Sequence, residues 1–599
     1  METMIYQEEF STEVEDGINS ALRGTAYYFN RDGLWLDTDK GPRKISNFVI
    51  IPQTNIIKES GMLSERFVEV LGYATFGFLP AVTLETGQYE SMNWMTKKWG
   101  LSLTVELPRS NNASHIWRVA QELGLEYAKD VVVYTHMGWK QIRGSWCYLH
   151  SSGVIGNEAA QVELAHDVVG YTLPDHADSY QEAVRASLRL KDVAPPEISV
   201  PLLALAYLSP LNEFFRQAGC EPAFVTMLTG PTGTMKSTLA ALALCHFGQF
   251  TAKSLPGSFN DTRNALDVKG FALKDTLMVV DDFYPSAYKS EYAKMASTLQ
   301  GLLRSYGDRS GRARMTSDIK LREVYVPRGN LLVTSEDVPN LEQSGLARQL
   351  MLEISPGDVN KEKLSSLQGD SFLLGQAMRG YIEWLIPQAD TLKDVLLEKF
   401  IAYRQQAQAG HPRLAEVMAW LRIGYEMFLD YAASFDVIPN GSRQIMLDEA
   451  LGIFKELTSR QAETMKIDTP VSQFLSALNE LLTSGQCHCI KLDDEGSPVG
   501  GFGNIKGRGF IGYADSVYYY LRPDAIMPAV IDFYRRQGLH FSTSKKMLLK
   551  QLASVEAIRE SRTEKRVNRT PDKRIGGENQ RYIWLKKEAL DKLNNPDEK

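Results

Sequence analysis

Hydrophobic periodicity divides the chain into four zones. Residues 1–190 mix aromatic, strand-like runs with helical stretches and predict an α+β N-terminal domain of unknown role. Residues 191–360 alternate strand-like runs with helical patterns, which is typical of a parallel α/β sheet. Residues 361–465 keep a 3.6-residue period and predict a helical lid and linker. Residues 466–599 form a small mixed unit with a basic segment near its end.

The most specific motif is a glycine-containing loop between an apolar strand-like run (224–228) and an apolar helix (239–247). Glycines let the backbone wrap closely around phosphates, and the positive end of the following helix attracts the anion. This strand–loop–helix context is that of a Walker A loop. We expect the loop to bind ATP through the following residues: Gly230, Pro231, Thr232, Gly233, Thr234, Met235, Lys236, Ser237 and Thr238.

Within this loop, Lys236 is expected to reach the β- and γ-phosphates, and Ser237 to ligate Mg²⁺. Met235 stands where the Walker A consensus has glycine. The position can carry a side chain if its backbone takes ordinary angles. The alternatives are a degenerate loop that no longer binds ATP and a chance match to the motif.

A second apolar run ends in two acids about forty residues after the loop, at Asp281 and Asp282. Carboxyl ends of parallel strands meet at one edge of a sheet, so both acids should lie beside the phosphate loop. Asp281 is expected to hold Mg²⁺ and Asp282 to polarise the attacking water. The alternative is a plain β-turn, because strands often end in Asp.

A third strand, residues 330–336, ends in Thr334, Ser335 and Glu336, and we favour Thr334 or Ser335 as the contact to the γ-phosphate or the water. The alternating segment before it (312–326) reads as a β-hairpin. Lys320 and Arg322 would lie near its tip and contact DNA, unless it is an ordinary surface hairpin.

Two later arginines are candidates for stabilising charge on the γ-phosphate. Arg348 follows the third strand and could project into the ATP site of a neighbouring subunit. Arg413 opens an apolar helix behind Pro412, a residue well placed at a helix start, and could swing onto the nucleotide from a lid. Surface salt bridges are the alternative for both.

The C-terminal unit predicts helices at 471–482, 525–537 and 545–552, then a strand at 580–585, which suggests a winged-helix domain. Lys545 and Lys546 would enter a DNA groove. Arg566, in the basic stretch 559–574, would bind phosphates with little sequence preference. A solvated loop is the alternative for that stretch.

Composition narrows the class of protein. With 44% hydrophobic and 23% charged residues among 599, the chain is globular and not wholly disordered. We find no run of about 18 uncharged apolar residues and no signal-peptide pattern, so we expect no membrane segment. Five scattered cysteines favour a reducing cytoplasm over a disulfide framework. The net charge of −7 does not exclude nucleic acid, because binding depends on local basic patches.

The loop, the Asp-Asp strand, the hairpin, the polar strand, the late arginine and the helical lid together resemble the AAA+ ATPases. Among these the chain is similar to minichromosome-maintenance and superfamily III helicases. It looks like replicative helicases of phage, plasmid and staphylococcal-cassette type, which carry an uncharacterised N-terminal domain. That last likeness rests on Thr135-His-Met-Gly-Trp139 and Tyr148-Leu-His, followed by Gly153-Val-Ile-Gly156.

The resemblance implies a P-loop AAA+ core and a ring, hexameric in such helicases, with ATP between subunits. Our leading hypothesis is a DNA helicase or translocase that acts on single-stranded and forked DNA during replication of a mobile genetic element, with other replication proteins as possible partners. The alternative is an ATP-switched initiator, loader or regulator without processive unwinding. A primase–helicase ranks lower, because residues 1–185 show no zinc cluster or polymerase motif.

Overall fold

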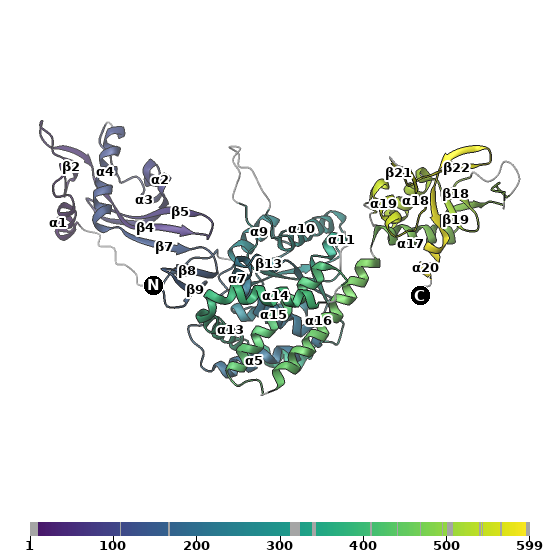
Figure 1. The fold of residues 1–599 in the computed structure, drawn as a ribbon. Coiled ribbons are helices and arrows are strands. Elements are labelled where there is room, and N and C mark those ends of the chain that lie inside the picture. Colours follow the sequence, from purple (N-terminus) through teal and green to yellow (C-terminus); the bar gives the residue numbers. More distant parts are fainter. Residues whose placement is uncertain are drawn as a thin grey trace.

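The computed structural model describes residues 10–594 apart from 108, 166–167, 312–323, 338–342, 408–409, 440, 468, 494, 500–506, 538–540, 542 and 564–565. Three lobes follow one another in chain order (Figure 1): an N-terminal lobe in purple, a large central body in teal and green, and a C-terminal unit in yellow.

The N-terminal lobe is built on a sheet with strand order β11-β7-β4-β5-β6. One side of this sheet packs on α4, whose Ile116, Val119, Ala120 and Leu123 are buried with strand residues in one apolar core. Its elements are α1 (Thr12–Ala21), β1 (Tyr27–Asn30), β2 (Gly33–Leu36), β3 (Arg43–Ser46), β4 (Phe48–Glu59), β5 (Ser64–Ala74), β6 (Gly77–Glu85), α2 (Thr86–Ser91), α3 (Met95–Trp99), α4 (Arg109–Tyr127) and β7 (Lys129–Tyr134).

The next segment joins this lobe to the central body, and it contains β8 (Gly138–Ile142), β9 (Ser145–His150), β10 (Gly153–Ile155), β11 (Gln161–Val162), α5 (Tyr180–Arg189) and η2 (Leu190–Asp192). Trp139 and Tyr148 are buried in the core of the central body. The backbone N–H of Trp139 donates to Asp275 Oδ2 at 2.9 Å, and Tyr148 Oη donates to the Asp275 carbonyl at 2.7 Å. Residues of β8 and β9 therefore pack into the central core, although they precede the expected domain limit at residue 190.

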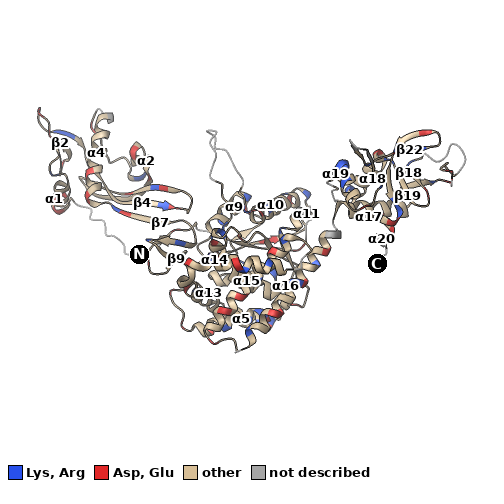
Figure 2. Cartoon of the chain, in the orientation of Figure 1, with Lys and Arg blue, Asp and Glu red and all other residues tan. Residues whose placement is uncertain are grey.

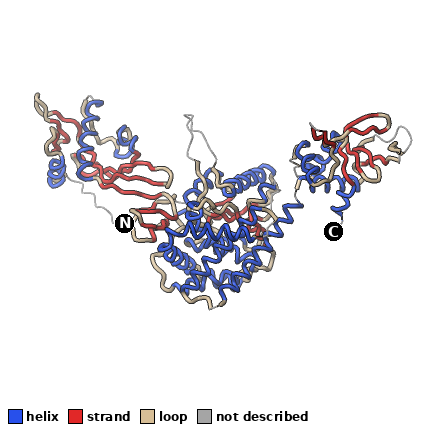
Figure 3. Tube along the Cα trace, viewed as in Figure 1, coloured by secondary structure: helices blue, strands red, loops and turns tan. Residues whose placement is uncertain are grey.

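The central body contains a five-stranded, all-parallel sheet with order β13-β14-β15-β12-β16. Every residue of β12 is buried, as expected for a strand covered on both faces. Figure 3 shows these strands in red with helices in blue around them. The elements are α6 (Pro196–Leu208), η3 (Ser209–Leu211), α7 (Asn212–Gln217), β12 (Val225–Thr229), α8 (Lys236–Leu244), η4 (Cys245–Phe247), β13 (Gly257–Ser258), α9 (Arg263–Ala272), β14 (Leu277–Phe283), α10 (Lys289–Gly307), β15 (Asn330–Ser335), α11 (Gln343–Leu346) and β16 (Gln349–Glu353).

The helices that follow the sheet pack into the same core. They are α12 (Lys361–Gly369), α13 (Phe372–Leu385), η5 (Ile386–Gln388), α14 (Ala389–Gln406), α15 (Pro412–Ser434) and α16 (Ser442–Ile467). The helical periodicity of this zone is confirmed, and α15 lies against the buried helix α6. Apolar residues of α13 to α16 and of the sheet form one continuous cluster, so no core boundary falls at residue 361.

The C-terminal unit has a four-stranded sheet, β17-β18-β19-β24, and a core of its own beneath it. The predicted helices at 471–482, 525–537 and 545–552 are confirmed as α17, α18 and α19. The elements are α17 (Pro470–Thr483), β17 (His488–Lys491), β18 (Phe510–Ala514), β19 (Tyr518–Leu521), α18 (Pro523–Arg536), α19 (Lys545–Ser554), β20 (Ser561–Thr563), β21 (Arg566–Asn568), β22 (Asp572–Ile575), β23 (Glu578–Arg581), β24 (Ile583–Lys586) and α20 (Lys587–Asn594).

One stretch of the described chain, Pro196–Gln217, is long and apolar enough to cross a membrane by composition alone. Its most apolar window is buried inside the central body, and every residue of α6 from Ile198 to Leu208 is buried, so the helix has no polar face. Core helices of large proteins have the same character.

Candidate functional site

The predicted phosphate loop lies between β12 and α8, with Lys236 as the first residue of the helix. Its amine donates to the carbonyl oxygens of Gly230 at 2.7 Å and Pro231 at 2.9 Å. Lys236 is buried, and loss of solvent lowers its pKa against the opposing effect of Glu336, Asp282 and Asp281. The loop backbone therefore wraps around the amine of Lys236.

Met235 departs from the expectation of ordinary backbone angles. Its φ of 65° and ψ of 26° are left-handed, as is the φ of 85° at Gly233. For a residue with a side chain this conformation costs roughly 1–2 kcal/mol. The Met235 side chain packs partly buried against the central core, which offsets part of that cost. The position thus needs the geometry that glycine provides, although it carries methionine.

The two acids of β14 sit on a β-bulge. The register with β15 shifts between Val280 and Phe283, and Asp282 has a φ of 71°. A bulge places two residues opposite one and re-aims their side chains. Here Asp281 accepts a hydrogen bond from the Thr334 hydroxyl, while Asp282 faces the pocket beside the loop.

The polar residues at the end of β15 form hydrogen bonds to the neighbouring strands and to the loop. The Thr334 hydroxyl accepts from the Asp282 backbone N–H at 3.0 Å and donates to Asp281. The Ser335 hydroxyl is bound to that of Thr229 at 2.7 Å. Glu336 instead reaches the loop, where its Oε1 accepts from the Thr232 hydroxyl at 2.6 Å. Sequence reasoning considered Glu336 but favoured the two hydroxyls; the strand pattern gives no indication that both are already hydrogen-bonded.

A pocket of about 270 Å³ beside the loop is lined by Lys236, Asp282, Thr334, Ser335 and Glu336, among other residues. Burial raises the pKa of Asp282, and the neighbouring carboxylates of Asp281 and Glu336 raise it further. The Ser237 hydroxyl also lines the pocket. No group of three or more potential ligands among the described residues could hold a metal by itself. A hydroxyl beside carboxylates suits Mg²⁺, which is commonly bound by one or two carboxylates together with substrate phosphates.

Arg348 lies at the opposite edge of the sheet from this pocket. Its carbonyl accepts from the backbone N–H of Val225, where β12 begins, whereas the phosphate loop follows Thr229, where β12 ends. Four residue steps at about 3.3 Å each separate the two edges by about 13 Å. We call the side that holds Lys236 the carboxyl edge and the side that holds Arg348 the amino edge.

Arg413 also lies at the amino edge, away from the pocket beside the predicted phosphate loop. It is the second residue of α15, and its guanidinium binds the Gly307 carbonyl at 3.1 Å and Asp308 Oδ1 at 3.0 Å. Arg348 binds both oxygens of the same carboxylate, at 3.0 and 2.9 Å. Burial raises the pKa of Asp308, but the two guanidinium groups outweigh this effect and lower it. Sequence reasoning missed Asp308 entirely.

The predicted DNA contacts are only partly within the described structure. Lys320 and Arg322 lie outside the described residues, as does the side chain of Arg566. Lys545 begins α19 behind the cap residue Ser544 and pairs with Asp524 at 2.9 Å. Lys546 is exposed, and Figure 2 shows the basic character of α19 in blue.

No protein-family profile and no curated protein sequence matches the chain. Among solved structures, it is similar to the SCCmec type IV Cch active helicase, with a TM-score of 0.55, 13% identity, and coverage of 95% of this chain and 99% of that one. A JCV helicase gives a TM-score of 0.23 and 15% identity, with coverage of 47% of this chain and 68% of that one. The ORC2 protein of Aeropyrum pernix gives a TM-score of 0.15 and 9% identity, with coverage of 71% of this chain and 95% of that one.

Of these three structures, the Cch helicase alone has a TM-score above 0.5. The similarity extends over nearly the full length of both chains. At 13% identity it establishes a shared fold only. The chain is thus a mixed α/β protein with a parallel sheet and a helicase-like fold.

Proposed function

We propose that the protein is an ATP-hydrolysing DNA motor whose active sites form between subunits packed head to tail. The single observation that carries this proposal is the opposition of charge across the central sheet. The carboxyl edge holds a buried amine surrounded by carboxylates, and the amino edge holds two arginines on one carboxylate. Neither arginine is placed to reach the nucleotide of its own chain.

Within one subunit, Lys236 binds the β- and γ-phosphates after leaving the two loop carbonyls that hold it. Ser237 and Asp281 would hold Mg²⁺, which supplies charge neutralisation on the phosphates. Asp282 accepts the proton of the attacking water. Glu336 lies across the same pocket and is the second candidate for this role.

The neighbouring subunit contributes Arg348 and Arg413. A guanidinium that meets the γ-phosphate stabilises the charge that develops during phosphoryl transfer. Each side chain retains partial exposure, 16% for Arg348 and 36% for Arg413, so both are accessible at the surface where a neighbour would pack. Head-to-tail contacts of this kind close into rings, and we propose a hexamer.

The motor acts on DNA. Lys545 and Lys546 at the start of α19 are proposed to bind phosphates in the manner of a winged helix, together with Arg566, whose side chain lies outside the described residues. Lys320 and Arg322 of the predicted hairpin are proposed to move against a single strand inside the ring. We propose replication of a mobile genetic element as the setting, as the resemblance in sequence motifs implies.

The second candidate is a nucleotide-driven switch that assembles on DNA without unwinding it. Both candidates use the same ATP site, so strand displacement on a forked substrate distinguishes them. The motor releases the displaced strand only with hydrolysable ATP, and Lys236→Ala releases none. An ATPase that hydrolyses normally yet never frees a strand would replace the motor by the switch.

A further inference from the structure

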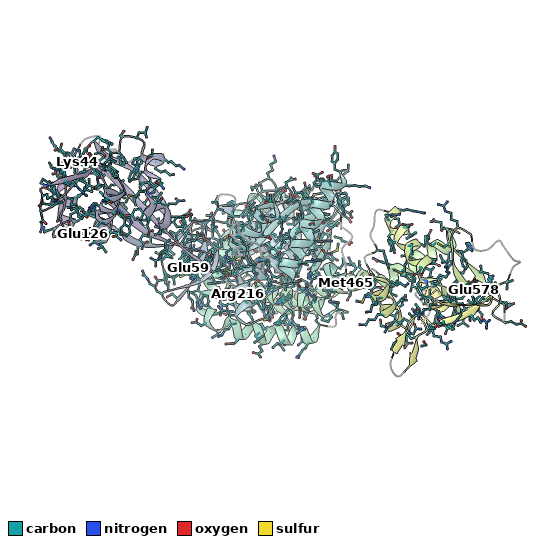
Figure 4. The ribbon with its side chains drawn as sticks, turned by 90° about the horizontal axis from the view of Figure 1, so that it is seen from above. Lys44, Glu59, Glu126, Arg216, Met465 and Glu578 are labelled. Carbon is teal, nitrogen blue, oxygen red and sulfur yellow. The ribbon has the colours of Figure 1, made fainter. Side chains whose placement is uncertain are left out.

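A second hollow lies where the N-terminal lobe meets the central body, and it shares no residue with the nucleotide pocket. Its volume is about 600 Å³, within the range of pockets that hold small ligands. The walls come from Gly61 and Met62 in the β4–β5 turn, from β8 and β9, from α7, and from residues 326–328 before β15. Figure 4 labels Glu59 of β4 and Arg216 of α7, which lie near this junction.

His136 gives this hollow an unused hydrogen-bond acceptor. The residue is 1% exposed and lines the hollow. Its Nδ1 lies 2.7 Å from the Met137 carbonyl, so Nδ1 carries the proton and Nε2 holds a lone pair. Burial lowers the pKa of His136 well below its usual range, and Arg328 and Lys274 lower it further, so the ring is neutral. Nε2 has no partner among the described residues, which is costly for a buried polar atom.

The rest of the lining combines positive charge with an aromatic wall. Four cations, Lys140, Arg216, Lys274 and Arg328, face two acids, Glu213 and Glu221. Some of this charge is compensated, because Lys140 pairs with Glu59 and Lys274 with Glu213 at 3.2 Å. Arg216 also pairs with Glu213, to which its Nε donates at 3.2 Å, and its side chain remains 53% exposed at the rim, where a phosphate can approach it from solvent.

Trp146 supplies the aromatic wall. Its Nε1 donates to Asp390 Oδ1 at 2.8 Å, which fixes the indole, and its ring packs at 86° to that of Trp139. A ring held in this way offers a stacking surface at little entropic cost.

We propose that this junction pocket binds one nucleotide, with its base against Trp146, a donor of the base on His136 Nε2 and its phosphate at the Arg216 rim. Each base carries an N–H donor, so such a pocket is tolerant of sequence. The nucleotide can be free or part of a single DNA strand. Because the pocket shares no residue with the phosphate loop, the inference stands whether or not the proposed motor function holds.

The test uses the full-length chain carrying Lys236→Ala, which removes the lysine of the phosphate loop from the measurement. Two probes are titrated: thymidine monophosphate by equilibrium dialysis and a fluorescent oligothymidylate by anisotropy. Arg216→Gln should weaken binding about threefold and reduce its salt dependence. His136→Leu should weaken it about tenfold, and His136→Gln, which keeps an acceptor near Nε2, should recover part of the loss. Arg185→Gln on α5, an exposed arginine outside the pocket, is the matched control.

The two probes separate the two sources of the nucleotide. If the pocket variants weaken binding of the oligonucleotide alone, the pocket binds a DNA strand. If they weaken binding of both probes, the pocket binds any nucleotide. His136 is buried, so its variants can fail to fold. Two readouts do not depend on them: the Arg216→Gln variant, and crosslinking of the chain to an oligonucleotide that carries iodouracil. A crosslinked peptide containing Trp146 supports the pocket. Unchanged binding of both probes by a folded Arg216→Gln chain, with crosslinks confined to other regions, overturns it.

Discussion

The two edges of the central sheet are opposite in charge and similar in design. At the carboxyl edge, one amine, Lys236, is surrounded by Asp281, Asp282 and Glu336. At the amino edge, one carboxylate, Asp308, is held between Arg348 and Arg413. Each edge supplies half of the proposed ATPase site, because neither edge alone places both a lysine and an arginine around one phosphate. Under the proposed function, catalysis therefore requires the carboxyl edge of one chain against the amino edge of another.

The largest expected effect comes from removing the amine at the carboxyl edge. Lys236→Ala should reduce ATP hydrolysis to background, because no other described cation lines that pocket. DNA binding by the C-terminal unit, measured by anisotropy at fixed salt, should be unchanged. Normal hydrolysis by this variant would show that the catalytic site lies elsewhere.

The amino edge should matter almost as much, although it lies far from its own nucleotide. Arg348→Ala is expected to lower kcat roughly 100-fold, the scale for loss of one charge-stabilising group. ATP binding by the isolated subunit should hardly change. Arg413→Ala should lower kcat by a smaller factor, about tenfold by the same reasoning. Arg185→Ala serves as control, and a strong loss of ATP binding in the isolated Arg348→Ala subunit would contradict the division into half-sites.

The pH dependence of hydrolysis distinguishes whether Asp282 or Glu336 accepts the proton of the attacking water. Asp282 must be ionised to accept a proton, so activity falls as pH decreases through its pKa. Burial and the neighbouring Asp281 and Glu336 raise that pKa, which places the acid limb higher than for a free Asp. Glu336→Gln removes one of the charges that raise the pKa of Asp282. The acid limb of the pH–activity profile should therefore move to lower pH, while activity at neutral pH stays within about threefold. Complete loss of activity would make Glu336 the base instead.

The smallest effect concerns the left-handed backbone of the loop. Met235→Ala keeps the strain and loses the packing, whereas Met235→Gly loses the packing and relieves the strain. We expect the Gly variant to exceed the Ala variant by about 1 kcal/mol in free energy of unfolding, measured with denaturant. Equal stabilities would mean that Met235 is not left-handed in solution.

Much of the carboxyl edge could be predicted from sequence, because local patterns specify it. The loop, the Asp-Asp strand and the polar third strand each occur as contiguous residues, and parallel strands bring their ends together. The bulge that turns Asp281 away from Asp282 could not be predicted, since an inserted residue leaves the hydrophobic run unchanged. Glu336 was undervalued because the strand pattern does not show that the hydroxyls of Thr334 and Ser335 are bound to neighbouring strands, whereas Glu336 reaches the loop.

The amino edge was much less predictable. Asp308 binds arginines that are 40 and 105 residues away in the chain, and no local pattern records such contacts. Packing between the expected domains depends on distant contacts as well. Pro195 and Pro196 lie at the start of α6, whose later residues are part of the central core. The Thr135–Trp139 motif, whose role was opaque in the sequence, places Trp139 against Asp275 of the central body.

The central claim is tested most directly by mixing two inactive proteins. Lys236→Ala subunits retain an intact amino edge, and Arg348→Ala subunits retain an intact carboxyl edge. When the two are combined and allowed to exchange, the account predicts that ATPase activity returns, because some interfaces join both intact edges. If mixed assemblies form but hydrolysis stays at the level of the separate variants, the active site is not shared between subunits and the account is contradicted.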